Sequence, residues 1–310
     1  MGMISKQELA KDLINCRFRY SADQHSFQRL YPFCNENVSG YLDILDLEGK
    51  SLLTVGSSAD QTISAIARGC KDITVLDICR FAEEYFYLKK AAIETLTPKE
   101  FGQLFFYKDY PRTFIYNRKP FVLAKYPKLL ERLKQERPDI HEFWLKLAGT
   151  HSGEMIRRNL FTNDEEKPLV TKQLTDYLKS EEAYYQTREK LKGVTPTFIN
   201  ANITHPDVIP SSYDNIVLSN LTTYLSYEEI EALFHTLESH LNEDGKLMLG
   251  YLYRTDETSG YCEEWDHIYN IPRIKSIHPD ITLQTIQGVK GVLFESEEMK
   301  DAVYIYQKKK

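Results

Sequence analysis

The chain has 310 residues, of which 42% are hydrophobic and 27% are charged, a composition that favours one large folded domain with an insertion, or two domains, over a disordered chain. Its formal net charge of −6 at pH 7 gives no single-sign field suited to wrapping duplex nucleic acid, so we expect no nucleic-acid partner. The five cysteines are odd in number and no two are spaced C-x-x-C, which is typical of a reducing compartment rather than of a disulfide framework or a zinc site.

The first elements are predicted in residues 1–50, as a helix, a polar loop and a short amphipathic helix that ends by Gly49. Residues 1–16 lack the apolar core of a signal peptide, and no apolar run approaches the length of a membrane span. We therefore expect a soluble cytoplasmic protein that does not insert into membranes.

A strand–helix–strand–helix unit follows. Residues 51–56 form a compact apolar run typical of a buried strand. The next helix is predicted to begin at Asp60 as a cap and to close at Gly69. Residues 72–78 are a second buried strand, and a long helix spans about 81–96, with Pro98 just beyond its end.

Residues 98–193 have a different composition from the strand–helix unit before them. They are rich in Tyr, Phe, Lys and Glu and show helical patterns at 126–135 and 181–191. After this region strands and helices alternate again. A helix is predicted over 226–241, and it starts at a capping pattern of Ser226 and Glu229. The remaining strands are predicted at 196–203, 212–221, 245–254, 282–289 and 302–308.

This order predicts an α/β fold with a doubly wound, mostly parallel seven-stranded sheet and a helical insertion. Residues 1–50 are expected to cover the site, and 98–193 to form an acceptor pocket or lid. Residues 51–97 and 194–310 are the two halves of the central domain. In such sheets ligands bind at the carboxyl ends of the strands, near the switch in strand order.

The first strand–helix–strand unit is shaped to hold a nucleoside. The small turn Gly56-Ser57-Ser58-Ala59 lies between a buried strand and a helix N-terminus, where free N–H groups suit an acceptor or an anion. Asp77 ends the second strand, about 20 residues downstream, where a carboxylate grips ribose hydroxyls. The chain contains neither Gly-x-Gly-x-x-Gly nor a P-loop motif, which counts against a dinucleotide and a nucleoside triphosphate and leaves S-adenosylmethionine.

Several segments resemble class I S-adenosylmethionine-dependent transferases. They are TVGSSAD (54–60), ITVLDI (73–78), FINANITHPDVIPSSYDNIVLSN (198–220) and DGKLMLGYLYR (244–254). The resemblance implies a Rossmann-like methyltransferase fold with S-adenosylmethionine as cosubstrate. The sequence departs from the family where Thr54 replaces the usual acid of the first motif, and where Ser58 and Asp60 replace two glycines.

A narrower resemblance is to an uncharacterised family related to betaine-lipid synthases, which transfer the 3-amino-3-carboxypropyl group instead of the methyl group. It is carried by TVGSSADQ and LDI, by YFYLKKAAIETL (85–96) and by TPKEFGQLF (97–105).

The candidate site residues follow from these positions. Several have an alternative structural role. Ser57, Ser58 and Asp60 can cap or brace a helix, and Asn200 and Asn202 can form turns. The expected cofactor-binding residues are Gly56, Ser57, Ser58, Asp60, Asp77, Ile78, Asn200, Asn202, Ser219 and Asn220. The expected substrate pocket is Tyr31, Asn35, Glu36 and Tyr224, whose alternative role is packing.

Three functions remain open from the sequence. The first is methyl transfer to a small or medium-sized acceptor, the second is 3-amino-3-carboxypropyl transfer, and the third is S-adenosylmethionine binding without catalysis. The sequence indicates no catalytic base. The histidines show no metal-binding spacing such as H-E-x-x-H, so no metal is expected.

Overall fold

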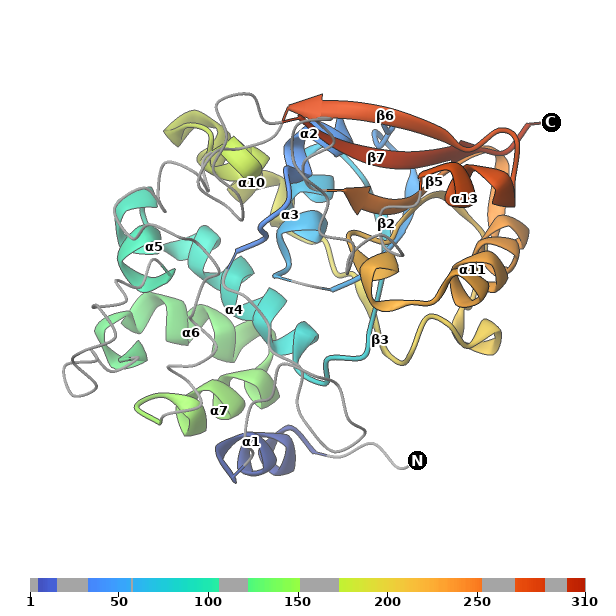
Figure 1. Cartoon of the computed structure of the whole chain (residues 1–310). Helices are drawn as coiled ribbons and strands as arrows, with labels where there is room; N and C mark the ends of the chain where they lie inside the picture. Colours follow the sequence, from blue (N-terminus) through green and yellow to red (C-terminus); the bar gives the residue numbers. More distant parts are fainter. Residues whose placement is uncertain are drawn as a thin grey trace, which may run out of the picture.

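The computed structural model describes residues 5–15, 33–56, 58–105, 122–150, 173–252, 271–287 and 300–309. Its centre is a seven-stranded sheet with the order β3-β2-β1-β4-β5-β7-β6 (Figure 1). The pairs among β1 to β5 are parallel, whereas β7 is antiparallel to both β5 and β6. The strands are β1 (Ser51–Thr54), β2 (Asp72–Asp77), β3 (Thr197–Asn200), β4 (Tyr213–Val217), β5 (Leu241–Leu252), β6 (Thr282–Gln287) and β7 (Lys300–Gln307).

This topology confirms the predicted mostly parallel, doubly wound sheet, with the single reversed strand of the Rossmann-like methyltransferase fold. The chain moves outward from β1 to β2 and β3 on one side, then returns to pair β4 with the other side of β1. The strand order therefore reverses between β1 and β4, and the carboxyl ends of these strands are the place where such a sheet binds its ligand.

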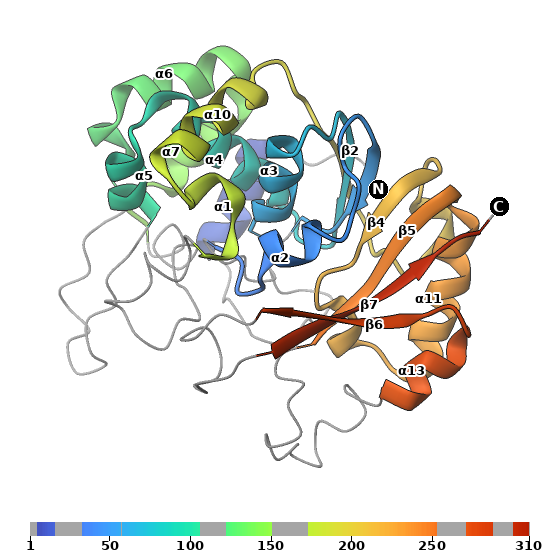
Figure 2. The same cartoon turned by 90° about the horizontal axis from the view of Figure 1, so that it is seen from above.

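Helices cover both faces of the sheet (Figure 2), because neighbouring residues of each buried strand face opposite sides. Leu52 packs into the core on one face and Leu53 into the core on the other, and Val217 and Ile216 divide in the same way. The first face carries α2 (Val38–Leu42), α3 (Asp60–Ala67) and α4 (Ala82–Thr95), and the second carries α11 (Tyr227–Ser239) and α13 (Ile271–Ile277).

The region 98–193 is helical where it is described, as predicted. Its helices pack around α4, and α1 (Lys6–Asn15) packs against α7. Pro98 lies just beyond the end of α4, as predicted, and it is also the first residue of a new helix, a position that needs no N–H donor. The region contains α5 (Pro98–Phe105), η1 (Leu123–Lys125), α6 (Pro127–Glu136), α7 (Pro138–Leu147), η2 (Asp176–Leu178) and α10 (Glu181–Leu191). None of the described helices combines the length and the apolar character that a membrane crossing requires.

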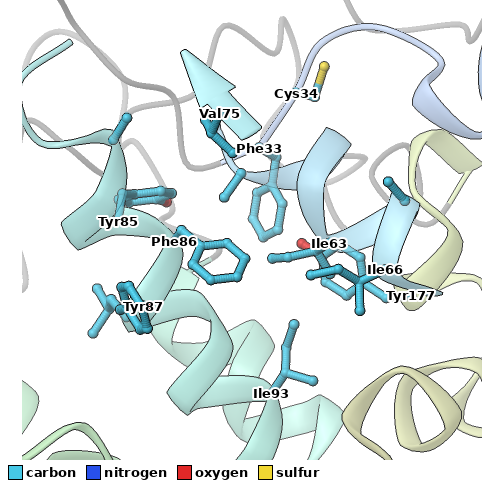
Figure 3. Close-up of a cluster of buried hydrophobic side chains, with 14 of the residues drawn as sticks. Phe33, Cys34, Ile63, Ile66, Val75, Tyr85, Phe86, Tyr87, Ile93 and Tyr177 are labelled. Carbon is cyan, nitrogen blue, oxygen red and sulfur yellow. The ribbon is translucent and has the colours of Figure 1, made fainter. Parts of the chain in front are cut away.

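The insertion shares the core of the sheet domain. Phe33, Phe101 and Tyr177 are buried together, with ring centroids 6.2 Å apart for the two phenylalanines and 5.9 Å apart for Phe101 and Tyr177. Figure 3 shows Phe33 and Tyr177 in the same cluster as Phe86 of α4. The Trp144 indole N–H of α7 also donates to the Glu84 carbonyl of α4, at 2.9 Å. These contacts fix the described part of the insertion against α4.

The start of α3 differs from the expectation that Asp60 caps it. Ala59 occupies the N-cap position in a left-handed conformation, with φ of 68°, and its side chain makes no capping hydrogen bond. Asp60 is the first helical residue and is completely buried. Gly69 follows the helix with φ of +87°, which confirms its predicted role at the C-terminus.

Helix α11 offers a direct test of the sequence-predicted capping box. The Glu229 N–H donates to the Ser226 hydroxyl at 3.2 Å, and the Ser226 N–H donates to the Glu229 carboxylate at 2.7 Å. Ser226→Ala removes the first bond, so we expect the free energy of unfolding in urea to fall by about 1 kcal/mol. Ser239→Ala, at the other end of the same helix, is the control and should change it less. An equal loss in both variants would contradict the capping role.

Candidate functional site

The carboxyl ends of the central strands bring most of the predicted site residues together. In the sheet register Thr54 of β1 lies opposite both Val75 of β2 and Val217 of β4. Strand β2 continues two residues further, to Asp77, which pairs with Asn200 of β3. The turn after β1, the end of β2 and the start of the turn after β3 therefore lie along one edge of the sheet.

Asp77 and Gly56 are in direct contact at this edge. The Gly56 N–H donates to one Asp77 carboxylate oxygen at 2.8 Å, and the Cys79 N–H donates to the other at 2.7 Å. A Cβ atom on residue 56 would lie 2.9 Å from the Ala82 Cβ and 2.9 Å from the Asp77 carboxylate. Only glycine fits here, because the first turn of α4 and the end of β2 approach so closely. The Asp77 carboxylate is therefore held in one orientation by the backbone of two loops.

Two asparagines shape the neighbouring turns. The Asn200 side-chain amide donates to the Asp77 carbonyl at 2.9 Å and to the Ile78 carbonyl at 3.1 Å. The Asn202 side chain accepts from the Thr204 N–H at 3.1 Å, which is the bond of an Asx turn. Ile78 is 41% exposed, high for a large apolar side chain. The turn-forming alternative thus describes both asparagines, and their contact with a ligand stays a prediction.

Ser58 and Asp60 belong to a buried polar network under the turn. One Asp60 oxygen accepts from the Lys89 ammonium at 2.5 Å and from the Tyr177 hydroxyl at 2.7 Å. The other accepts from the Ser58 hydroxyl at 2.8 Å and from the Cys34 N–H at 2.6 Å. Asp60 and Lys89 are both fully buried. Four hydrogen bonds satisfy the carboxylate completely, so Asp60 acts as the anchor of this network.

Lys89 links the network to the turn. Its ammonium also donates to the Ser58 carbonyl at 2.9 Å and lies 4.5 Å from the centre of the Phe33 ring. Burial lowers the pKa of Lys89, and the Asp60 carboxylate opposes that shift. The pair joins the turn after β1 to α4, to η2 of the insertion and to residues 33 and 34 of the N-terminal segment.

Glu36 lies at the carboxyl end of β4. One of its oxygens accepts hydrogen bonds from the Ser219 hydroxyl and, at 3.0 Å, from the Asn220 N–H. Ser219 itself has φ of 59°, a conformation that is rare outside glycine and that concentrates at functional sites. The Glu36 side chain is 1% exposed, and its second oxygen is buried with no hydrogen-bond partner. Burial raises the pKa of Glu36 to about 7, although the bonds from Ser219 and Asn220 lower it.

The structure says less about the other predicted pocket residues. Tyr224 is 75% exposed in η4 (Leu221–Tyr224), directly after β4, and Asn35 is half-buried beside Glu36 in the chain. Tyr31 and Ser57 lie outside the described residues. Within the described ranges no group of three or more His, Cys, Asp or Glu side chains is arranged to hold a metal ion.

Sequence reasoning missed Lys89 and Tyr177. The signal for Lys89 was its position in the otherwise apolar helix segment FYLKKAAI, where a buried lysine needs an acidic partner. Tyr177 carries no such signal, because its contact with Asp60 joins residues 117 positions apart.

No protein-family model matches this sequence, and no curated protein is significantly similar to it. Solved structures of three methyltransferases are among those that resemble it. The N-methyltransferase NodS from Bradyrhizobium japonicum WM9, in complex with S-adenosyl-L-homocysteine, has 11% identity and a TM-score of 0.38, over 87% of this chain and 82% of that one. Magnesium protoporphyrin IX methyltransferase from Synechocystis PCC 6803 has 9% identity and a TM-score of 0.36, over 87% and 79% of the two chains.

The third is a TehB-like SAM-dependent methyltransferase from Corynebacterium glutamicum ATCC 13032 Kitasato, with 9% identity and a TM-score of 0.37 over 89% of this chain and 88% of that one. Because each TM-score is below 0.5, the fold assignment stands on the strand order and strand directions of this chain.

The Asp60–Lys89 pair predicts a large stability effect. Lys89→Met leaves the Asp60 carboxylate buried without its counter-ion, so we expect the free energy of unfolding in urea to fall by about 3–5 kcal/mol. The double variant Asp60→Asn with Lys89→Met removes both charges and should recover part of that loss. A loss below about 1 kcal/mol for Lys89→Met would contradict the anchoring role.

Glu36 predicts a pH-dependent stability. Because its pKa is raised from 4.5 to about 7 in the folded protein, the folded state holds a proton there that the unfolded state has lost, and stability falls as pH rises from about 4.5 to 7. Glu36→Gln keeps an acceptor for Ser219 and Asn220 and removes this loss. Urea unfolding at pH 5 and pH 8 should show the variant gaining up to about 3 kcal/mol relative to the wild type at the higher pH. The same pH dependence in both proteins would contradict the assignment.

Proposed function

We propose that this protein is an S-adenosylmethionine-dependent transferase, and that it transfers the methyl group to a small or medium-sized acceptor. The observation that carries the proposal is the contact between Gly56 and Asp77 across the carboxyl ends of β1 and β2. It puts a backbone turn and an oriented carboxylate side by side next to the switch point between β1 and β4, as a nucleoside requires.

The residues at this edge fit an adenosine. The Gly56 and Cys79 N–H groups orient the Asp77 carboxylate, and a carboxylate is the acceptor that we propose for the ribose hydroxyls. The exposed Ile78 side chain offers an apolar surface for the adenine ring. The absence of a Cβ at Gly56 lets its backbone lie against Ala82 and the Asp77 carboxylate, while Ser58 and Asp60 hold the turn from below.

S-adenosylmethionine supplies an electrophilic carbon attached to a positively charged sulfur, which is a good leaving group. The task left to the protein is to hold the acceptor in line with that carbon and sulfur at short range. A strong base is not required for an amine or a thiol acceptor. Ser219 and Asn220, at the end of β4, are proposed to face the amino-acid part of the donor or the acceptor. The insertion and residues 33–37 are proposed to border the acceptor.

Asp77 is the residue whose substitution tests the donor site. Asp77→Asn replaces a charged acceptor by a neutral amide, so we expect the calorimetric affinity for S-adenosylhomocysteine to fall roughly 10- to 100-fold. Asp72→Asn changes the same residue type at the exposed opposite end of β2 and should leave the affinity unchanged. Circular dichroism and thermal unfolding check that both variants fold. Equal affinity in the wild type and in Asp77→Asn would remove Asp77 from the donor site.

The reaction itself is tested by its nucleoside product. Incubation with S-adenosylmethionine and a metabolite extract should yield S-adenosylhomocysteine, detected by mass spectrometry. The resemblance to the betaine-lipid synthase relatives supports the alternative, 3-amino-3-carboxypropyl transfer, which would yield 5′-methylthioadenosine instead. Binding of the donor with neither product would favour a protein that binds S-adenosylmethionine without catalysis.

A further inference from the structure

Glu36 has a buried, unpartnered oxygen that its structural role leaves unexplained. The hydrogen bonds from Ser219 and Asn220 both reach the same oxygen, Oε1, and fix the side chain at the carboxyl end of β4. The other oxygen, Oε2, is buried and accepts nothing. An unsatisfied buried acceptor is costly, and each one in a folded protein calls for an explanation such as a ligand.

The electrostatic surroundings of Glu36 favour a cation. Within the described ranges Glu36 forms no ion pair with a lysine, an arginine or a histidine. The nearby Asp301 carboxylate on β7 adds a second negative charge, although it accepts a hydrogen bond from the Tyr251 hydroxyl. Among the residues that the structure describes, the ionisable groups that face Glu36 are neutral or acidic: Cys34, Tyr41 of α2, Tyr224 of η4, Tyr251 of β5 and Asp301 of β7.

We propose that Glu36 is an ammonium-binding carboxylate, whose free oxygen accepts a hydrogen bond from a primary ammonium group of a bound ligand at the end of β4. This inference rests on the proposed function. The ammonium has two possible sources: the α-ammonium of the S-adenosylmethionine donor, or an amine of the acceptor. An ammonium supplies the missing donor and the missing counter-charge together, whereas a neutral hydroxyl would supply only the first.

The proposal predicts release of a proton on binding. Empty Glu36 has a pKa of about 7, so it is partly protonated at pH 6 to 7, and an ammonium ion lowers that pKa by stabilising the carboxylate. Binding at pH 7 should therefore release about half a proton, and binding at pH 6 close to one. Isothermal titration calorimetry in buffers of different ionisation enthalpy measures this number, which a purely structural glutamate would not change.

Three titrations, into the wild type and into Glu36→Gln, distinguish the two sources. The first uses S-adenosylhomocysteine, the second uses 5′-methylthioadenosine, which lacks the amino-acid part, and the third adds methylammonium to protein saturated with S-adenosylhomocysteine. If the donor supplies the ammonium, only the first releases the proton, and Glu36→Gln abolishes the release and weakens binding roughly tenfold or more. If the acceptor supplies the ammonium, only the third titration releases the proton.

Nucleoside binding without proton release in any titration, or identical release by Glu36→Gln, would overturn the proposal and leave the proposed function intact. Failure of both nucleosides to bind would instead contradict the proposed function, and this inference with it. Thermal unfolding of Glu36→Gln confirms that the variant is folded, and the amide oxygen keeps an acceptor for Ser219 and Asn220.

Discussion

The hydrogen bond from the Gly56 N–H to the Asp77 carboxylate is the interaction on which the account of this site depends. It joins the turn after β1 to the last residue of β2, and the Cys79 N–H holds the second carboxylate oxygen. The distance between the two loops leaves no room for a Cβ at position 56. The orientation of the carboxylate is therefore set by backbone atoms before any ligand is present, and such preorganisation lowers the cost of binding.

The buried Asp60–Lys89 pair explains how this turn tolerates residues other than glycine. Where the first motif of class I S-adenosylmethionine-dependent transferases usually has further glycines, this chain has Ser58 and Asp60, which bond to each other and to Lys89 beneath the turn. A buried ion pair adds little net stability in general, because desolvation offsets much of the attraction. Its value here is geometric: it ties the turn to α4, to the Tyr177 hydroxyl in η2 and to the backbone of Cys34.

The regular part of the fold could be predicted because its signals are local. The apolar runs of β1 and β2, the capping box of α11 and Gly69 after α3 each lie within a few residues of one another. The buried networks could not be predicted, because they join residues that are distant in sequence. Glu36 was selected from its sequence position, but its contact with Ser219 spans 183 residues, and the contact of Asp60 with Tyr177 spans 117. Asp60 was predicted to cap α3 because the sequence did not show that its carboxylate pairs with Lys89, which lies 29 residues away in the chain.

We propose that an adenosine binds where β1 and β2 end, with its ribose on Asp77. The most direct test is a crystal structure of the protein with S-adenosylhomocysteine. We expect both ribose hydroxyls within hydrogen-bond distance of the Asp77 carboxylate and the adenine ring against Ile78. A nucleoside bound elsewhere on the protein, with the Asp77 carboxylate contacting no part of it, would rule out this donor site.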